Sequence, residues 1–227
     1  LAQGHSVRCF DVATKENQRR ARQIPGRFEV VWGDLRRPEE VAAAVRGQEA
    51  IVHLAFVIPN LSVTGVGSEQ RPDFAREVNV DGTRNLLEAA TASPQRPDFI
   101  FASSLHVYAP TQPLPPPRRV TDTPQPVEHY ARHKVACEEM VRGAGLRWAI
   151  LRLAAAMPIR LIVDSGVFDV PLNNRIEYVH GRDVALAMAN TLHAEAAWGR
   201  TWHIGGGAAG QFIYRDLAAR VLDAFGV

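Results

Sequence analysis

Residues 99 to 108 read FIFASSLHVY, an unbroken apolar run that passes into two serines. A strand with one face in water would alternate apolar and polar residues, so this run is typical of a strand that is covered on both faces. Similar short runs recur along the chain and alternate with longer stretches of helical period. Such alternation is typical of βαβ units around a parallel sheet. The sequence therefore predicts an α/β fold with a doubly wound parallel sheet.

The same patterns locate the individual elements. The expected strands are Val7–Asp11, Phe28–Gly33, Ala50–Leu54, Phe99–Ser103, Trp148–Leu153 and Trp202–Ile204. The expected helices are Pro38–Val45, Phe74–Ala92, His129–Gly143, Arg182–His193 and Tyr214–Phe225. Residues 58–72 and 109–126 are expected loops after strands, at the carboxyl edge where ligands of such sheets bind. The proline-rich run in the second loop is either a substrate-facing segment or a stiff spacer.

The composition excludes several classes of protein. The 227 residues include 26 basic and 24 acidic ones, and the arginine doublets are scattered, which indicates solvated faces rather than a nucleic-acid surface. The two cysteines, Cys9 and Cys137, cannot build a disulfide framework or a zinc site of the usual spacing. No apolar run reaches the length of about 18 residues that spans a bilayer, and the first residues lack the pattern of a signal peptide. We therefore expect a cytoplasmic protein without membrane or nucleic-acid partners.

The stretch EHYARHKVACEEM, residues 128 to 140, places Tyr130 and Lys134 four positions apart in an expected helix. The chain has only two lysines, so the spacing is a motif of modest specificity, and an ordinary solvated helix face is the other interpretation. A phenol has a pKa of about 10, so a tyrosine base at neutral pH needs a neighbouring cation. A lysine four residues later on a helix supplies one on the same face. The spacing is therefore that of an acid/base pair.

Polar residues that follow expected strands extend this hypothesis. Ser104 could bond a substrate oxygen, although a serine at such a position also forms turns and caps. If Tyr130 takes the proton of that hydroxyl, hydride leaves the carbon, and its acceptor must be a nicotinamide. Asp11 is placed to bind an adenosine ribose, and Asp34 to reach adenine while Leu35 packs against the ring. Each aspartate could instead cap the helix that follows it.

Nine blocks of the sequence occur in the order found in one enzyme family. They are VRCFD, GDLRRPEEV, IVHLAF, NVDGTRNLLEAA, FIFASSLHVY, YARHK, ILRL, EYVHGRDVALA and WHIGGG. On these blocks the chain resembles the extended short-chain dehydrogenase/reductase family, the NAD-dependent epimerase and dehydratase group, through nearly its whole length. The resemblance implies a Rossmann-like fold and NAD-dependent hydride transfer on a hydroxyl or carbonyl group of a small-molecule substrate.

The resemblance also implies a role for each matching residue of the reaction centre. Tyr130 would be the general acid/base, and Lys134 would lower the pKa of that phenol and hold the nicotinamide ribose. Ser104 would bond the reacting oxygen.

The cofactor-binding residues follow from the same resemblance. Asp11 would bind the adenosine ribose, Asp34 and Leu35 the adenine, and Ala55 would contact the cofactor through its backbone. A carboxylate at Asp11 repels a 2′-phosphate, so we expect NAD rather than NADP, although the nearby Arg19 and Arg20 could soften that preference.

Four further residues match the family or suggest a metal, and each has a simpler interpretation. Asn79 is expected to be structural, and Asp183 to be a helix cap and packing anchor. His53 and His106 have no third partner at ligand spacing, so we expect no metal.

The chain also departs from the family. Residues 1–153 are expected to form the dinucleotide-binding domain, and residues 154–227 a mixed region with a short, reduced substrate lobe. The family's glycine-rich phosphate loop has no counterpart here, so we expect the chain to begin after the first strand and to bind cofactor poorly by itself. The glycines at 205–207 match a later turn of the family and cannot replace that loop.

Two kinds of function stay open. One is an enzyme of the epimerase, dehydratase or simple oxidoreductase type. The other is a non-catalytic dinucleotide-binding sensor or scaffold, which would need no Tyr-Lys pair. By analogy with the family, residues 74–92 and 129–143 would form a homodimer contact. The substrate would be selected by loops that carry no interpretable motif.

Overall fold

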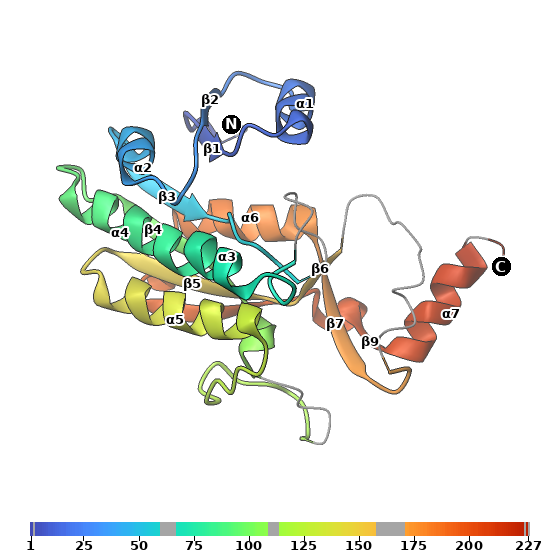
Figure 1. The fold of residues 1–227 in the computed structure, drawn as a ribbon. Coiled ribbons are helices and arrows are strands. Elements are labelled where there is room, and N and C mark those ends of the chain that lie inside the picture. Colours follow the sequence, from blue (N-terminus) through green and yellow to red (C-terminus); the bar gives the residue numbers. More distant parts are fainter. Residues whose placement is uncertain (2, 60–66, 109–113, 158–170, 225, 227) are drawn as a thin grey trace. The chain divides into compact units, whose positions relative to one another are not determined.

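The computed structural model of the chain alternates strands and helices from one end to the other (Figure 1). It describes all residues except 2, 60–66, 109–113, 158–170, 225 and 227. Parts of both expected loops and of the expected substrate lobe therefore lie outside the described residues. The chain divides into two compact units, Leu1–Phe101 with Val127–Trp148, and Ala102–Pro126 with Ala149–Val227. The boundary expected after Leu153 stays a prediction.

The first unit begins with a βαβ segment. Strands β1 (Arg8–Asp11) and β2 (Glu29–Trp32) pair in parallel and are joined by helix α1 (Lys15–Gln23); α2 (Pro38–Val45) follows. Helix α1 was not expected, because KENQRRARQ has no apolar stripe and buries no residue. It begins at the Thr14 cap, whose side chain accepts the N–H of Asn17 at 3.0 Å.

The rest of the first unit packs helices against the strand β3 (Ala50–His53) and the first part of β4 (Asp98–Ser104), which pair in parallel; the last three residues of β4 belong to the second unit. The helix expected from Phe74 to Ala92 is instead α3 (Pro72–Arg76), a π-helical turn (Glu77–Asp81) and α4 (Gly82–Ala92). Helix α5 (His129–Gly143) has the expected bounds and lies beside α4 (Figure 1).

The second unit contains two groups of strands. Strands β5 (Trp148–Leu153) and β8 (Arg200–Ile204) pair in parallel. A further sheet has the order β6-β7-β9 (Ala155–Met157, Arg175–His180, Gln211–Ile213), in which β6 and β7 are parallel and β7 and β9 antiparallel. Helices α6 (Gly181–Thr191) and α7 (Tyr214–Ala224) complete the unit. The strands of this sheet were not expected: β6 and β9 have three residues each, and the six residues of β7 lie in the region where the sequence predicts a reduced substrate lobe.

The core explains why the apolar runs form strands. In β4 the consecutive residues Phe99, Ile100 and Phe101 are all 0% exposed, although successive side chains of a strand point to opposite faces. The strand is thus covered on both faces, as its sequence predicts. The α/β fold with a parallel sheet is confirmed, whereas β1 and β2 pair with each other in a separate two-stranded sheet.

One expected cap is wrong. The side chain of His180 caps α6 by accepting the N–H of Arg182 at 3.2 Å, and Asp183 lies exposed in the first turn. Asp183 is thus neither the cap nor a packing anchor, and its charge there suits the positive end of the helix dipole. In the part of the chain that the structure describes, no helix is both long and apolar enough to cross a membrane.

Candidate active site

The expected acid/base pair lies in the first two turns of α5, whose start is capped by a distant segment. The Glu69 carboxylate accepts the backbone N–H of His129 at 3.2 Å and that of Tyr130 at 3.0 Å. These are N–H groups that have no partner within the helix itself. Burial opposes ionisation of Glu69, but the hydrogen bonds from Tyr130 and His129 hold the pKa of its carboxyl below the usual value. The cap fixes the turn that carries Tyr130.

Lys134 is buried beside the Tyr130 ring, with 3% of the lysine exposed. Its Nζ lies 5.6 Å from the centroid of the Tyr130 ring. The same atom lies 3.5 Å from the centroid of Phe56 and 4.9 Å from that of Phe101. Burial lowers the pKa of Lys134 to about 7, because the ammonium is removed from water. The structure therefore brings the two side chains together on one helix face and surrounds the amine with aromatic rings.

The segment after β3, which contains Ala55 and Phe56, is held in place by Asn79. The Asn79 side chain accepts the N–H of Val57 at 2.6 Å and donates to the carbonyl of Val57 at 3.0 Å. Its amide nitrogen also lies 3.3 Å from Nδ1 of His133. Asn79 is completely buried in the π-helical turn before α4. Its contacts are those of a structural residue that fixes the backbone beside Lys134's aromatic neighbour.

His53 is a buried histidine that belongs to the same polar network. Its Nε2 lies 2.8 Å from Oγ1 of Thr83, whose hydroxyl donates to the carbonyl of Asn79. Since that hydroxyl has one proton, Nε2 of His53 carries a hydrogen and donates it. Burial, with a smaller effect from the charge of Lys134, lowers the pKa of His53 to about 3. Among the residues that are described, no cluster of three or more His, Cys, Asp or Glu could hold a metal ion.

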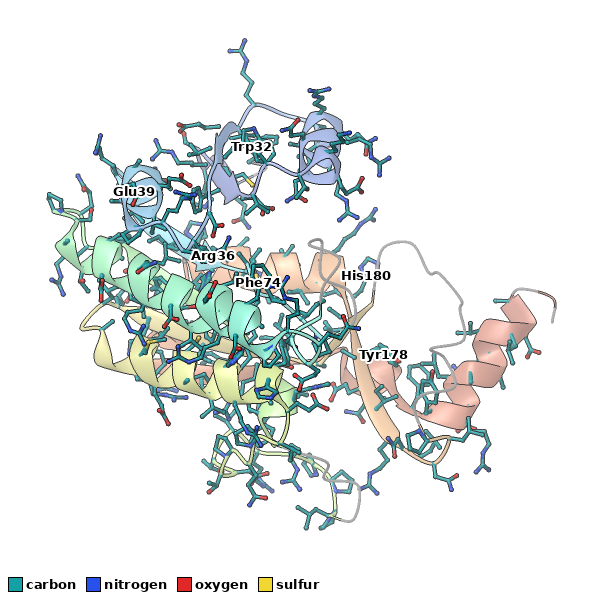
Figure 2. All side chains as sticks on the ribbon, viewed as in Figure 1. Trp32, Arg36, Glu39, Phe74, Tyr178 and His180 are labelled. Carbon is teal, nitrogen blue, oxygen red and sulfur yellow. The ribbon has the colours of Figure 1, made fainter. Side chains whose placement is uncertain are left out.

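The two expected cofactor carboxylates follow neighbouring parallel strands. Asp11 ends β1 and accepts the N–H of Val12 at 2.8 Å. Asp34 follows β2 and binds the guanidinium of Arg36, with 2.7 Å between Nη2 and Oδ2. The hydrogen bonds from Arg36 hold the pKa of Asp34 below its usual value. Arg36 also lies over the Phe74 ring, 5.1 Å from its centroid (Figure 2). A ligand that needs the Asp34 carboxylate would compete with this arginine.

The remaining expected residues have varied surroundings. Leu35 is 7% exposed and packs closely against Gly82. Any larger residue at position 82 would bring its Cβ to 2.8 Å from the Cβ of Leu35, so this packing needs glycine. Ala55 is exposed after β3. Ser104 ends β4, and its hydroxyl accepts the N–H of His106 at 3.2 Å. Ser104 belongs to the second unit, so its grouping with the pair on α5 stays a prediction.

The second unit contains another polar cluster, which was not predicted from the sequence. Arg152 of β5 is 3% exposed, donates to the Tyr108 hydroxyl and lies 5.0 Å from the centroid of that ring. The same hydroxyl lies 2.7 Å from Nε2 of His203 on β8. Phe56 and Glu69 were also not predicted. These residues come together only through tertiary structure, so no local spacing could have found them.

The comparison with known families decides the relationship. The sequence model of the NAD dependent epimerase/dehydratase family matches residues 1–157. The chain belongs to this family. Human 3 beta-hydroxysteroid dehydrogenase type 7 is 34% identical to it over 128 residues, which are 56% of this chain and 31% of that protein. The 3-beta-hydroxysteroid dehydrogenase of Mycolicibacterium neoaurum is 33% identical over 153 residues, or 63% and 37% of the two chains. The chain described here thus spans about a third of the length of each of these two relatives.

One solved structure has the same fold as this chain over almost the whole length of the chain. It is a dTDP-glucose 4,6-dehydratase from Streptomyces venezuelae, with NAD bound, which has a TM-score of 0.79 and 24% identity. The match covers 98% of this chain and 72% of the dehydratase. At this identity the likeness shows the fold alone, and it confirms the Rossmann-like architecture expected from the sequence.

Proposed function

We propose that this member of the NAD dependent epimerase/dehydratase family transfers hydride between NAD and a hydroxyl or carbonyl group of a small molecule, with Tyr130 as its acid/base. The observation that carries the proposal is the buried Lys134 amine, 5.6 Å from the centroid of the Tyr130 ring. A cation at that position favours the phenolate over the phenol. An ordinary solvated helix face would leave the lysine in water, where its charge would be screened.

In the proposed reaction the hydroxyl of the substrate is oriented by Ser104 and loses its proton to the Tyr130 phenolate. The C–H bond of the same carbon breaks, its electron pair leaves with the hydrogen as hydride, and a carbonyl forms. NAD, when bound, supplies the acceptor for that hydride. In the reverse direction the Tyr130 phenol returns the proton to the carbonyl oxygen. Lys134 stabilises the phenolate in both directions.

The residues at the carboxyl ends of β1 and β2 support the choice of cofactor. One oxygen of Asp11 accepts the N–H of Val12. A carboxylate has further acceptor capacity on its second oxygen, which suits a ribose diol. Asp34 would accept a hydrogen bond from the adenine after releasing the guanidinium of Arg36. Leu35 and Ala55 would contact the cofactor as the family resemblance implies.

The curated relatives favour simple oxidation over epimerisation or dehydration. The two relatives described above are named 3 beta-hydroxysteroid dehydrogenases. A dehydrogenase releases the carbonyl product once hydride has left, whereas an epimerase or dehydratase returns hydride to its substrate. We infer that the substrate is a secondary alcohol and the product the corresponding ketone.

The test is the change Tyr130→Phe, which removes only the hydroxyl that moves the proton. Turnover of secondary alcohols should fall at least about a thousandfold, within the range of general acid/base catalysis, while NAD affinity changes little. The matched control is Tyr178→Phe, because Tyr178 is a half-buried tyrosine of β7 to which the proposed mechanism gives no role. Turnover that survives Tyr130→Phe would reject the mechanism, and NAD binding without any turnover by the unchanged protein would favour a sensor or scaffold.

A further inference from the structure

Phe56 contacts both members of the proposed catalytic pair. The face of its ring lies under the Lys134 amine, with 3.5 Å between Nζ and the ring centroid. Its ring also makes a T-shaped contact with the Tyr130 ring, at 5.7 Å between centroids and 88° between planes. Both geometries are favourable for aromatic groups. One side chain outside the pair thus touches both of its members.

The backbone of Phe56 is anchored, so its ring is a fixed platform. The next residue, Val57, exchanges two hydrogen bonds with the completely buried Asn79 side chain. The Phe56 ring also packs on that of Phe101, in the buried centre of β4, at 6.3 Å between centroids. Its position is therefore set by β4 and the π-helical turn, neither of which belongs to α5.

We infer that Phe56 is a positioning residue of the Tyr130–Lys134 site, whose ring holds the Lys134 ammonium against the phenol and stabilises its charged form. The inference rests on the function proposed above and adds a residue to it. Cys137 and Glu138 of α5 also act on the amine and favour its charged form, and the charge of Lys134 acts in turn on His53 of β3. Three aromatic faces lie around Nζ, with centroids at 3.5 Å for Phe56, 4.9 Å for Phe101 and 5.6 Å for Tyr130.

The chain allows a direct test, because Lys15 and Lys134 are its only lysines. Selective ¹³C,¹⁵N-lysine labelling gives two side-chain signals, and the exposed Lys15 is an internal control. In the unchanged protein the ε-methylene protons of Lys134 should show an upfield ring-current shift relative to Lys15. This measurement needs no variant, and equal shifts of the two lysines would overturn the inference.

The variant arm compares Phe56→Leu with Phe56→Tyr. Leucine keeps the amine covered but removes the ring, so the pKa of Lys134 should fall by about one unit, the equivalent of a desolvated cation–π contact. Tyrosine keeps the ring face and should restore the value. An unchanged or raised pKa in Phe56→Leu would show that the ring only excludes water, and would reject the inference.

Kinetics separate this inference from the proposed function. Phe56→Leu should lower kcat more than it changes KM and should move the pH profile, while Phe56→Tyr recovers both. If the lysine titration shifts as expected but the unchanged protein oxidises no secondary alcohol at NAD concentrations that saturate it, the proposed function fails and the placement of the ammonium by Phe56 stands. If turnover depends on Tyr130 but neither the titration nor kcat responds to Phe56→Leu, only the role of Phe56 fails.

Discussion

At the scale of single residues, Lys134 has the least usual surroundings. Its amine is buried among rings, which lowers its pKa from 10.5 to about 7. The unfolded chain therefore binds more protons than the folded chain between these pH values, and stability should rise with pH across that window. Below about pH 7 the lysine is charged in both states, and the full burial penalty opposes folding.

The change Lys134→Met tests this relationship. At pH 6 the variant should be more stable than the unchanged protein by roughly 2–4 kcal/mol, and the difference should shrink by pH 10. Urea unfolding at the two pH values measures it. The control is Lys15→Met, since Lys15 is exposed on α1 and its loss should matter little at either pH. A stability difference that is independent of pH would show that the amine is uncharged or hydrated in the folded protein.

Only those residues of the reaction centre that lie on one helix could be paired from their spacing in the sequence. Four residues on a helix place two side chains on one face, so Tyr130 and Lys134 could be paired from the sequence. The ring of Phe56 reaches the same amine from a segment almost eighty positions away, and no periodicity connects the two. Likewise the sequence locates Asp34 at a strand end but says nothing of its ion pair with Arg36, which forms across a turn.

At the scale of elements, the start of α5 depends on a side chain 61 positions from Tyr130. The N-cap residue Glu128 does not cap the helix with its own side chain, and the Glu69 carboxylate does so in its place. Because Glu69 is anionic, it also interacts favourably with the positive end of the helix dipole.

The change Glu69→Ala should destabilise the protein by roughly 1 kcal/mol, the usual effect of losing a cap. Glu69→Gln keeps an acceptor oxygen and should recover about half of that loss. Thermal unfolding of the two variants measures the difference. Glu128→Ala is the matched control from the same helix start and should have a smaller effect. If Glu69→Ala and Glu128→Ala behave alike, the long-range cap contributes nothing of its own.

The elements that escaped prediction share a physical cause. Helix α1 is polar on every side and is supported locally, by the Thr14 cap and by ion pairs of Glu16 with Arg19 and Arg20. The strand β9 has three residues, too few for an alternation to be recognised. The π-helical turn carries Asn79, whose partners Val57 and His133 are distant in the sequence, and periodicity alone cannot show such contacts.

At the scale of the whole molecule, the alternation of apolar runs and amphipathic stretches was enough to predict the α/β class. Burial of both faces of a parallel strand leaves a continuous apolar run in the sequence, and β4 and β5 keep that pattern in the structure. The division into two units could not be predicted in full. One of its three cuts, after Pro126, falls at the end of the expected proline-rich loop, but the cuts after Phe101 and Trp148 fall within or at the start of apolar strands, where no change of composition marks them.

The cofactor preference is also a property of the whole protein, since it depends on the net field at the end of β1. The Asp11 carboxylate should repel a 2′-phosphate, so the dissociation constant of NADP should exceed that of NAD at least about tenfold. Arg19 and Arg20 are already engaged with Glu16, at 2.8 and 2.7 Å, which weakens their competing attraction. Calorimetry gives both constants if the protein and cofactor concentrations are high enough for the weak binding expected of the chain by itself, and a preference for NADP would refute the assignment.

The change Asp11→Asn should narrow that gap severalfold, because it removes the charge and keeps a hydrogen-bonding side chain of the same shape. Asp98→Asn is the control, since Asp98 lies at the opposite, amino end of its strand and pairs with Arg147 at 2.9 Å. That control should leave the ratio of the two constants unchanged. If both variants shift the ratio equally, the preference comes from the overall charge of the protein, and Asp11 has no specific contact with the ribose.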